Sequence, residues 1–106
     1  MSALTIDPEP RSVRLARTWV VEELTGLGRE DLAEAAELGV SELVTNALLH
    51  AEPPIRLRLG GTTDHPRVEV HDSSARPPDL GTSDFDEDDE HLMRTFGRGL
   101  GIVALY

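Results

Sequence analysis

Apolar residues recur at intervals of three and four in the first part of the chain. They are Val13, Ala16, Val20 and Leu24. This spacing predicts an amphipathic helix with Ser12 as its N-cap and an end near Gly26 or Gly28. A second stretch, from about Asp31 to His50, is rich in Ala, Leu and Glu and stops before Pro53-Pro54. It predicts a longer helix.

Three short segments alternate apolar and polar residues, as strands with one buried face do. They are Leu4-Thr5-Ile6, IRLRLG at 55–60 and RVEVHD at 67–72. The last two are separated by residues rich in turn formers, from Gly60 to Pro66. We therefore expect the second and third strands to be antiparallel neighbours.

The pattern changes after Asp72. The following segment has few apolar residues and carries seven acids between Asp79 and Glu90, which predicts a long loop. Order is expected again at Leu92-Met93. The final GRGLGIVALY places three glycines before an apolar pattern, and it predicts a helix that runs to the end of the chain.

Composition excludes several functional classes. The 106 residues suit a single domain, and the formal charge of -10 argues against nucleic-acid binding. There is no cysteine, so neither a disulfide framework nor a thiolate metal site is possible. The apolar runs are too short for a membrane span, and the acidic start does not resemble a signal peptide. We therefore expect a cytoplasmic protein.

The segment ELVTNALLHA, residues 42–51, places Glu42 and Asn46 four residues apart on the second predicted helix. They would project about 40° apart at the edge of its apolar stripe. Asn46 could bond to a neighbouring strand or loop while Glu42 reaches solvent. Alternatively, the two could line a pocket, with Asn46 binding a hard cation such as Mg²⁺ and Glu42 accepting a proton.

Two further positions are candidates for binding. Asp72 directly follows a predicted strand, where it could bond to a ligand or merely turn the chain. The GRGLG segment at 97–101 could cradle an anion at a helix start, although a tight turn would also explain its glycines. Arg94 and Arg98 would add positive charge there.

In this order the motifs resemble the GHKL superfamily of ATP-binding domains, and most closely the bacterial anti-sigma factor serine/threonine kinases. ELVTNALLHA is similar to the family's N box (42–51), VEVHDSSARPP to its first glycine box (68–78), and GRGLG to its second (97–101). The resemblance covers nearly all of residues 1–106 as one domain. It implies an α+β fold, a two-layer sandwich with a mixed, mainly antiparallel sheet and helices on one face.

The resemblance also implies roles for individual residues, with ATP and Mg²⁺ as cofactors. Glu42 would be the general base, Asn46 would coordinate the Mg²⁺ that bridges the ATP phosphates, and Asp72 would bind the exocyclic amine of adenine. The loop of about 75–96 would be the ATP lid. The remaining implied nucleotide-binding residues are Ser74, Gly97, Arg98, Gly99, Leu100 and Gly101. His50 is expected to be structural.

Three features depart from the family pattern. Ser74 replaces the glycine of an Asp-x-Gly turn, and the lid is strongly acidic although it would close over a polyanion. The chain also stops at Tyr106, where the family continues with a further strand. A missing C-terminal strand would expose a sheet edge, so we expect low stability alone or a homodimer.

The implied function is that of a serine/threonine protein kinase that phosphorylates an anti-sigma factor antagonist and sequesters a sigma factor. A nucleotide-responsive binding module without kinase turnover is the first alternative. A structural adaptor that has lost the nucleotide is the second.

Overall fold

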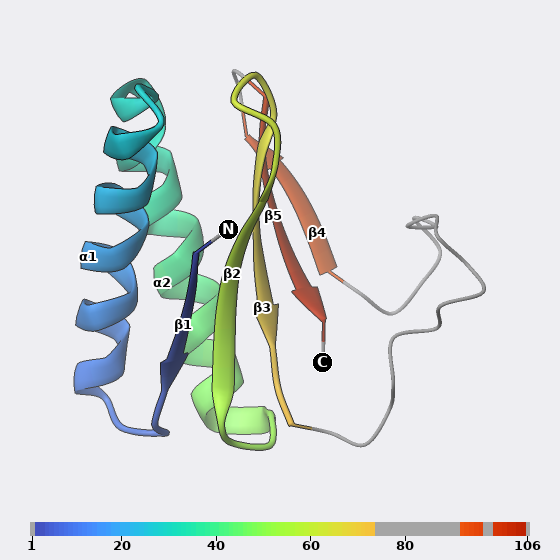
Figure 1. The fold of residues 1–106 in the computed structure, drawn as a ribbon. Coiled ribbons are helices and arrows are strands. Elements are labelled where there is room, and N and C mark those ends of the chain that lie inside the picture. Colours follow the sequence, from blue (N-terminus) through green and yellow to red (C-terminus); the bar gives the residue numbers. More distant parts are fainter. Residues whose placement is uncertain (1, 74–91, 97–98, 106) are drawn as a thin grey trace.

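The computed structural model describes residues 2–73, 92–96 and 99–105, with side chains omitted for 92–96. Two helices, α1 (Arg11–Gly26) and α2 (Ala33–His50), lie on the same side of a five-stranded sheet (Figure 1). A short 3₁₀ helix, Glu30–Leu32, precedes α2. The α+β fold with helices on one face of a mixed sheet is therefore confirmed.

The sheet has the strand order β1-β2-β3-β5-β4. Its strands are β1 (Ala3–Ile6), β2 (Ile55–Gly61), β3 (Pro66–His71), β4 (Leu92–Phe96) and β5 (Leu100–Leu105). Every neighbouring pair is antiparallel except β3 and β5, which run parallel. The predicted hairpin of the second and third strands is thus confirmed as β2 and β3.

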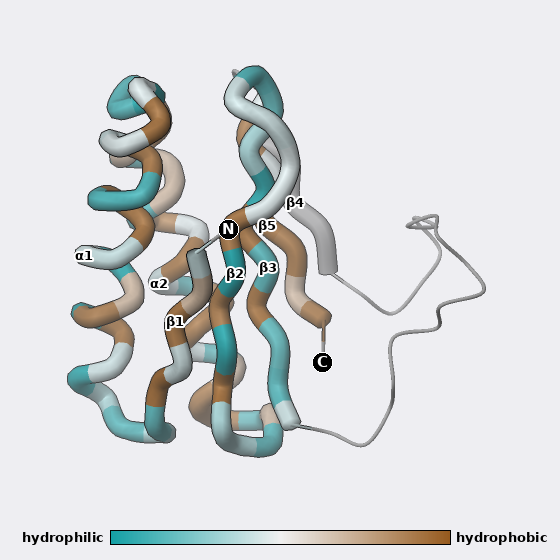
Figure 2. The backbone as a smooth tube through the Cα atoms, viewed as in Figure 1, coloured by the Kyte–Doolittle hydropathy of each residue, from teal (hydrophilic) through white to brown (hydrophobic). Residues whose placement is uncertain are grey.

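The hydrophobic core lies between the helices and the sheet. On β2, Ile55, Leu57 and Leu59 are buried, whereas Arg56 and Arg58 between them are exposed, because successive strand residues face opposite sides of a sheet. Figure 2 shows this alternation along β2. The buried positions of α1 include Ala16, Val20 and Leu24, as its three- and four-residue spacing predicted. Their fully buried side chains meet the core from the helix side.

The prediction of Ser12 as an N-cap is wrong. The cap position is two residues earlier, at Pro10, and the helix begins at Arg11; a proline's fixed φ already suits a helical start. Ser12 is buried in the first turn, and its hydroxyl donates a hydrogen bond of 2.7 Å to the Asp7 carbonyl. The hydroxyl therefore ties α1 back to the segment that follows β1.

The prediction of a C-terminal helix is also wrong, because Leu100–Leu105 form strand β5. Ile102 and Ala104 join the core beneath the helices, and Val103 between them is buried as well. Ile and Val favour strands, and β5 gains backbone partners on both sides, from β3 and β4. The sheet therefore includes a strand at this end of the chain, formed by residues of the expected helix itself.

The segment of about 75–96 that we expected to be the ATP lid is only partly described. Its last residues, Leu92–Phe96, form β4, which pairs with β5 and is thus a strand and not loop. Residues 74–91 lie outside the described residues, and so does the acidic stretch.

A buried glutamate stands on the face of the sheet that carries neither α1 nor α2. Glu69 on β3 accepts hydrogen bonds from Arg67, whose Nη2 lies 2.8 Å away, and its Oε1 lies 3.0 Å from Nε2 of His71. The bond with His71 is the largest cause that lowers the pKa of Glu69; burial opposes it, and Arg67 lowers the pKa further. Folding therefore favours the ionised carboxylate.

The lowered pKa of Glu69 predicts that the protein loses stability in acid. Because the folded pKa lies below the ordinary value of 4.5, the contribution of Glu69 is complete above that value and is lost as pH falls through the folded pKa. Urea unfolding measures the free energy of unfolding of the parent and of Glu69→Gln. Between about pH 6 and pH 3 this free energy should fall less in the variant than in the parent. Glu22→Gln, at an exposed site on α1, is the control. An equal acid loss in all three proteins would contradict the coupling.

Candidate functional site

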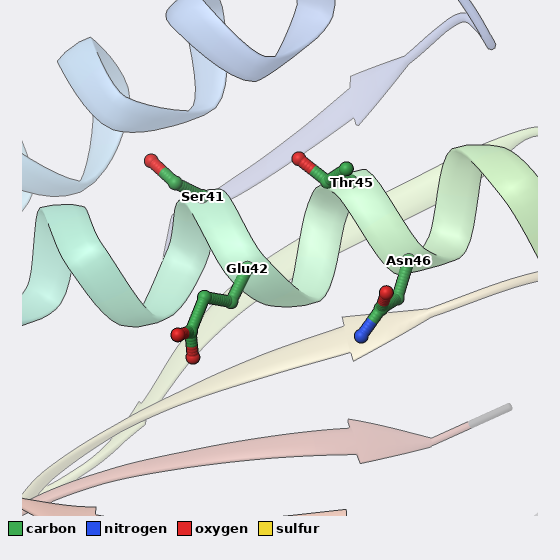
Figure 3. A pocket seen from close by; sticks show the side chains of 4 residues that line it. All are labelled: Ser41, Glu42, Thr45 and Asn46. Carbon is green, nitrogen blue, oxygen red and sulfur yellow. The ribbon is translucent and has the colours of Figure 1, made fainter.

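Glu42 and Asn46 lie on the exposed side of α2, next to the buried Leu43 and Ala47. The helix forms here because buried side chains recur at 40, 43, 44 and 47, which keeps the stripe against the sheet. Figure 3 shows the side chains of Glu42 and Asn46 projecting from the same side of the helix. The predicted pairing of these two groups is thus present in the fold.

Both residues line an open depression of about 490 Å³, together with Ser41 and Thr45. The Asn46 carboxamide forms no hydrogen bond within the described part of the chain, so the alternative in which it bonds to a neighbouring strand is not seen there. Glu42 takes part in a further interaction of its own. The carboxamide of Asn46 is therefore available to a ligand at the surface of α2.

Asp72 lies at the end of β3, beside the residues that follow α2. Its Oδ2 accepts a hydrogen bond of 3.0 Å from the backbone N–H of Glu52. Ser73 reinforces this junction, since its N–H donates to the Glu52 carbonyl at 2.9 Å and its hydroxyl bonds to the carbonyls of Glu52 and Pro53. Asp72 therefore fixes the chain after the helix, whatever else it binds.

Among the described residues, Asp72 does not line the depression that Asn46 lines. Asn46 lies about one turn before the end of α2 at His50, and Glu52, the partner of Asp72, lies two residues beyond that end. The groups thus sit along the same end of α2. The expected adenine contact of Asp72 stays a prediction.

The described glycines of the second glycine box, Gly99 and Gly101, lie at the opposite end of β3 from Asp72. In the parallel pairing of β3 and β5, Gly101 is opposite Arg67 and Leu105 is opposite His71, so Gly99, Leu100 and Gly101 are at the start of β3. Asp72 follows its end, roughly 17 Å away along the strand. The predicted helix start is therefore wrong, while phosphate binding by these glycines stays a prediction.

Gly99 instead makes a tight turn against the β2–β3 hairpin. Its φ is +87°, and a Cβ there would lie 2.6 Å from Nδ1 of His65 and 2.7 Å from the Asp64 carbonyl. A helix would not accommodate that φ. Of the other predicted nucleotide-binding residues, Ser74, Gly97 and Arg98 lie outside the described residues.

The donor set near Asn46 suits a hard divalent cation. Mg²⁺ keeps most of its waters and takes one or two protein oxygens together with phosphate oxygens, and the exposed carboxamide can supply one. Among residues 2–73 and 99–105 there is no group of three or more His, Asp or Glu side chains that could hold a metal alone. A cation held by the Asn46 carboxamide would take its other ligands from water and phosphate oxygens.

Three residues at this site were not predicted. Ser41 and Thr45 line the depression, and their spacing of four residues on α2 parallels that of Glu42 and Asn46, so the helical period could have indicated them. Glu52 contributes through its backbone N–H, which no side-chain pattern reveals. His50, expected to be structural, is exposed in the last turn of α2.

The comparisons with known proteins bear on the whole chain. A family model described as a histidine kinase-like ATPase domain matches residues 6–105. No curated protein and no solved structure gives a significant match. None of the helices that the structure describes has the length and apolar character needed to cross a membrane. The chain belongs to the histidine kinase-like ATPase domain family.

Proposed function

We propose that this chain binds Mg-ATP and acts as an anti-sigma factor serine/threonine kinase. In this proposal it phosphorylates an anti-sigma factor antagonist and sequesters a sigma factor. The observation that carries the proposal is the placement of Glu42 and Asn46 side by side on the exposed face of α2, in a chain that belongs to an ATPase family.

Each residue has a role in this proposal. Asn46 would hold the cation through its carboxamide oxygen, and bound Mg²⁺ would neutralise the charge of the phosphates. Glu42 would accept the proton of the attacking hydroxyl, and the Asp72 carboxylate would accept a hydrogen bond from the adenine amine. Phosphoryl transfer depends mainly on positioning and charge stabilisation, so no covalent nucleophile is required.

A nucleotide-responsive binding module is the second candidate. Glu42 favours chemistry over binding alone, because recognition of adenine and Mg²⁺ would not need a base. Slow hydrolysis of ATP in place of transfer to a protein would use the same groups.

The partners follow from the proposed kinase function: a sigma factor and an antagonist protein, without direct contact to nucleic acid or membrane, and in the cytoplasm. We also propose that the chain forms a homodimer. Among the strands that the structure describes, β1 and β4 are at the edges of the sheet, and strand edges without a partner favour pairing with another chain.

Nucleotide binding is tested by thermal unfolding with and without Mg-ATP. At a hundredfold excess over its dissociation constant, the ligand should stabilise the parent by about 2.7 kcal/mol. Asn46→Ala should lose most of this gain, and GTP should stabilise the parent less than ATP because its base lacks the adenine amine. Thr45→Ala, at another residue of the depression, should retain it.

If Mg-ATP does not stabilise the parent, the result would favour the alternative that the chain is a structural adaptor that has lost nucleotide binding. Stabilisation that is equal in the parent and Asn46→Ala would exclude Asn46 as the cation ligand.

A further inference from the structure

The face of the sheet that carries neither helix presents basic side chains in a strongly acidic chain. Arg56 and Arg58 are exposed on β2, and Arg67 and His71 lie beside them on β3. The formal charge of the whole chain is -10, so clustered cations on one face are unexpected. Such a concentration of one sign generates a local potential that attracts the opposite charge.

The acid in this cluster is already engaged. Glu69 is opposite Arg58 in the register of β2 and β3, but its two oxygens bond to Arg67 and His71 instead. Neither Arg56 nor Arg58 forms an ion pair with any residue that the structure describes. The two guanidinium groups therefore remain open to an external anion.

The neighbours on the other side leave these groups accessible. Thr5 of β1 is opposite Arg56, and Ala3 is opposite Arg58. Both side chains are small and exposed, so they do not cover the longer arginines. Figure 1 shows α1 and α2 together on the opposite side of the sheet.

We propose that Arg56 and Arg58, on this face of the sheet, bind an acidic, extended segment of a partner protein. Alternate residues of β2 are about 6.8 Å apart, which is also the spacing of alternate side chains in an extended peptide. Carboxylates at every second position can thus meet Arg56 and Arg58 in turn. Guanidinium groups bind carboxylates through paired hydrogen bonds, which adds geometric specificity to the attraction.

Nucleic acid is disfavoured as the occupant. Stacking of nucleic-acid bases needs aromatic side chains beside the cationic groups. Trp19 is the single aromatic residue whose side chain the structure describes, and it is half-buried on α1.

The test uses a fluorescent peptide of alternating Glu and Thr, without nucleotide, so that its result is independent of the proposed kinase function. Anisotropy should show binding by the parent that weakens with added salt. Arg56→Glu with Arg58→Glu should weaken it by about tenfold or more. Arg14→Glu with Arg17→Glu on α1 changes the net charge equally and should leave binding nearly unchanged.

Equal weakening in both double variants, or no binding by the parent, would overturn the proposal. Tighter binding of oligothymidine than of the acidic peptide would overturn the assignment of the partner. If the glutamate variant fails to fold, Arg56→Gln with Arg58→Gln removes the charge at similar length, and a loss of binding is again expected.

Discussion

Replacing Glu42 by Gln is expected to lower the rate of phosphoryl transfer by about 10²- to 10⁴-fold, the contribution typical of a general base. The amide keeps the size of the side chain and its place on α2 but does not accept the proton of an attacking hydroxyl. Binding of Mg-ATP should change little, because Asn46 and Asp72 remain in place.

The rate is measured with labelled ATP and a candidate antagonist protein, and binding with the thermal shift described above. Glu37→Gln removes the same charge from an exposed site on α2 that does not line the depression, and it should retain the parent rate. If Glu42→Gln transfers phosphate as fast as the parent, Glu42 is not the base. A loss of both transfer and binding would instead indicate a role in holding the nucleotide.

Local patterns in the sequence predicted most of the helices and strands. The apolar spacing from Val13 to Leu24 was enough to place α1, and the turn formers between Gly60 and Pro66 were enough to place the β2–β3 hairpin. Both rest on interactions among residues close in sequence. The same holds for Glu42 and Asn46, because the period of one helix determines their common side.

Predictions that depended on distant parts of the chain were less successful. A short apolar run such as Leu100–Leu105 is compatible with either a helix or a strand, and its pairing with β3 decides between them. The bond between Asp72 and Glu52 joins residues twenty positions apart, and nothing in the local pattern of either segment indicates it. The location of the glycines at the start of β3 follows from the strand assignment.

Replacing Ile102 by Ala is expected to reduce the free energy of unfolding by about 2–5 kcal/mol, the range for large-to-small changes in a packed core. Ile102 is fully buried on β5, opposite Val68 of β3, and belongs to the core shared with α2. Alanine removes that packing and leaves a cavity, and it also favours strands less than isoleucine does. Urea unfolding followed by circular dichroism measures the change.

Leu38→Ala is the matched control, because Leu38 is 61% exposed on α2 and its truncation should cost little. The pair of variants therefore tests the burial of Ile102 that the strand assignment requires. If Ile102→Ala is as stable as the parent, Ile102 is not packed in the core and β5 is not a central strand of this sheet. If Ile102→Ala is destabilised as expected, Ile102 is part of the core, and any contact of Gly99 or Gly101 with a phosphate must be made from the start of β5, at the opposite end of β3 from Asp72.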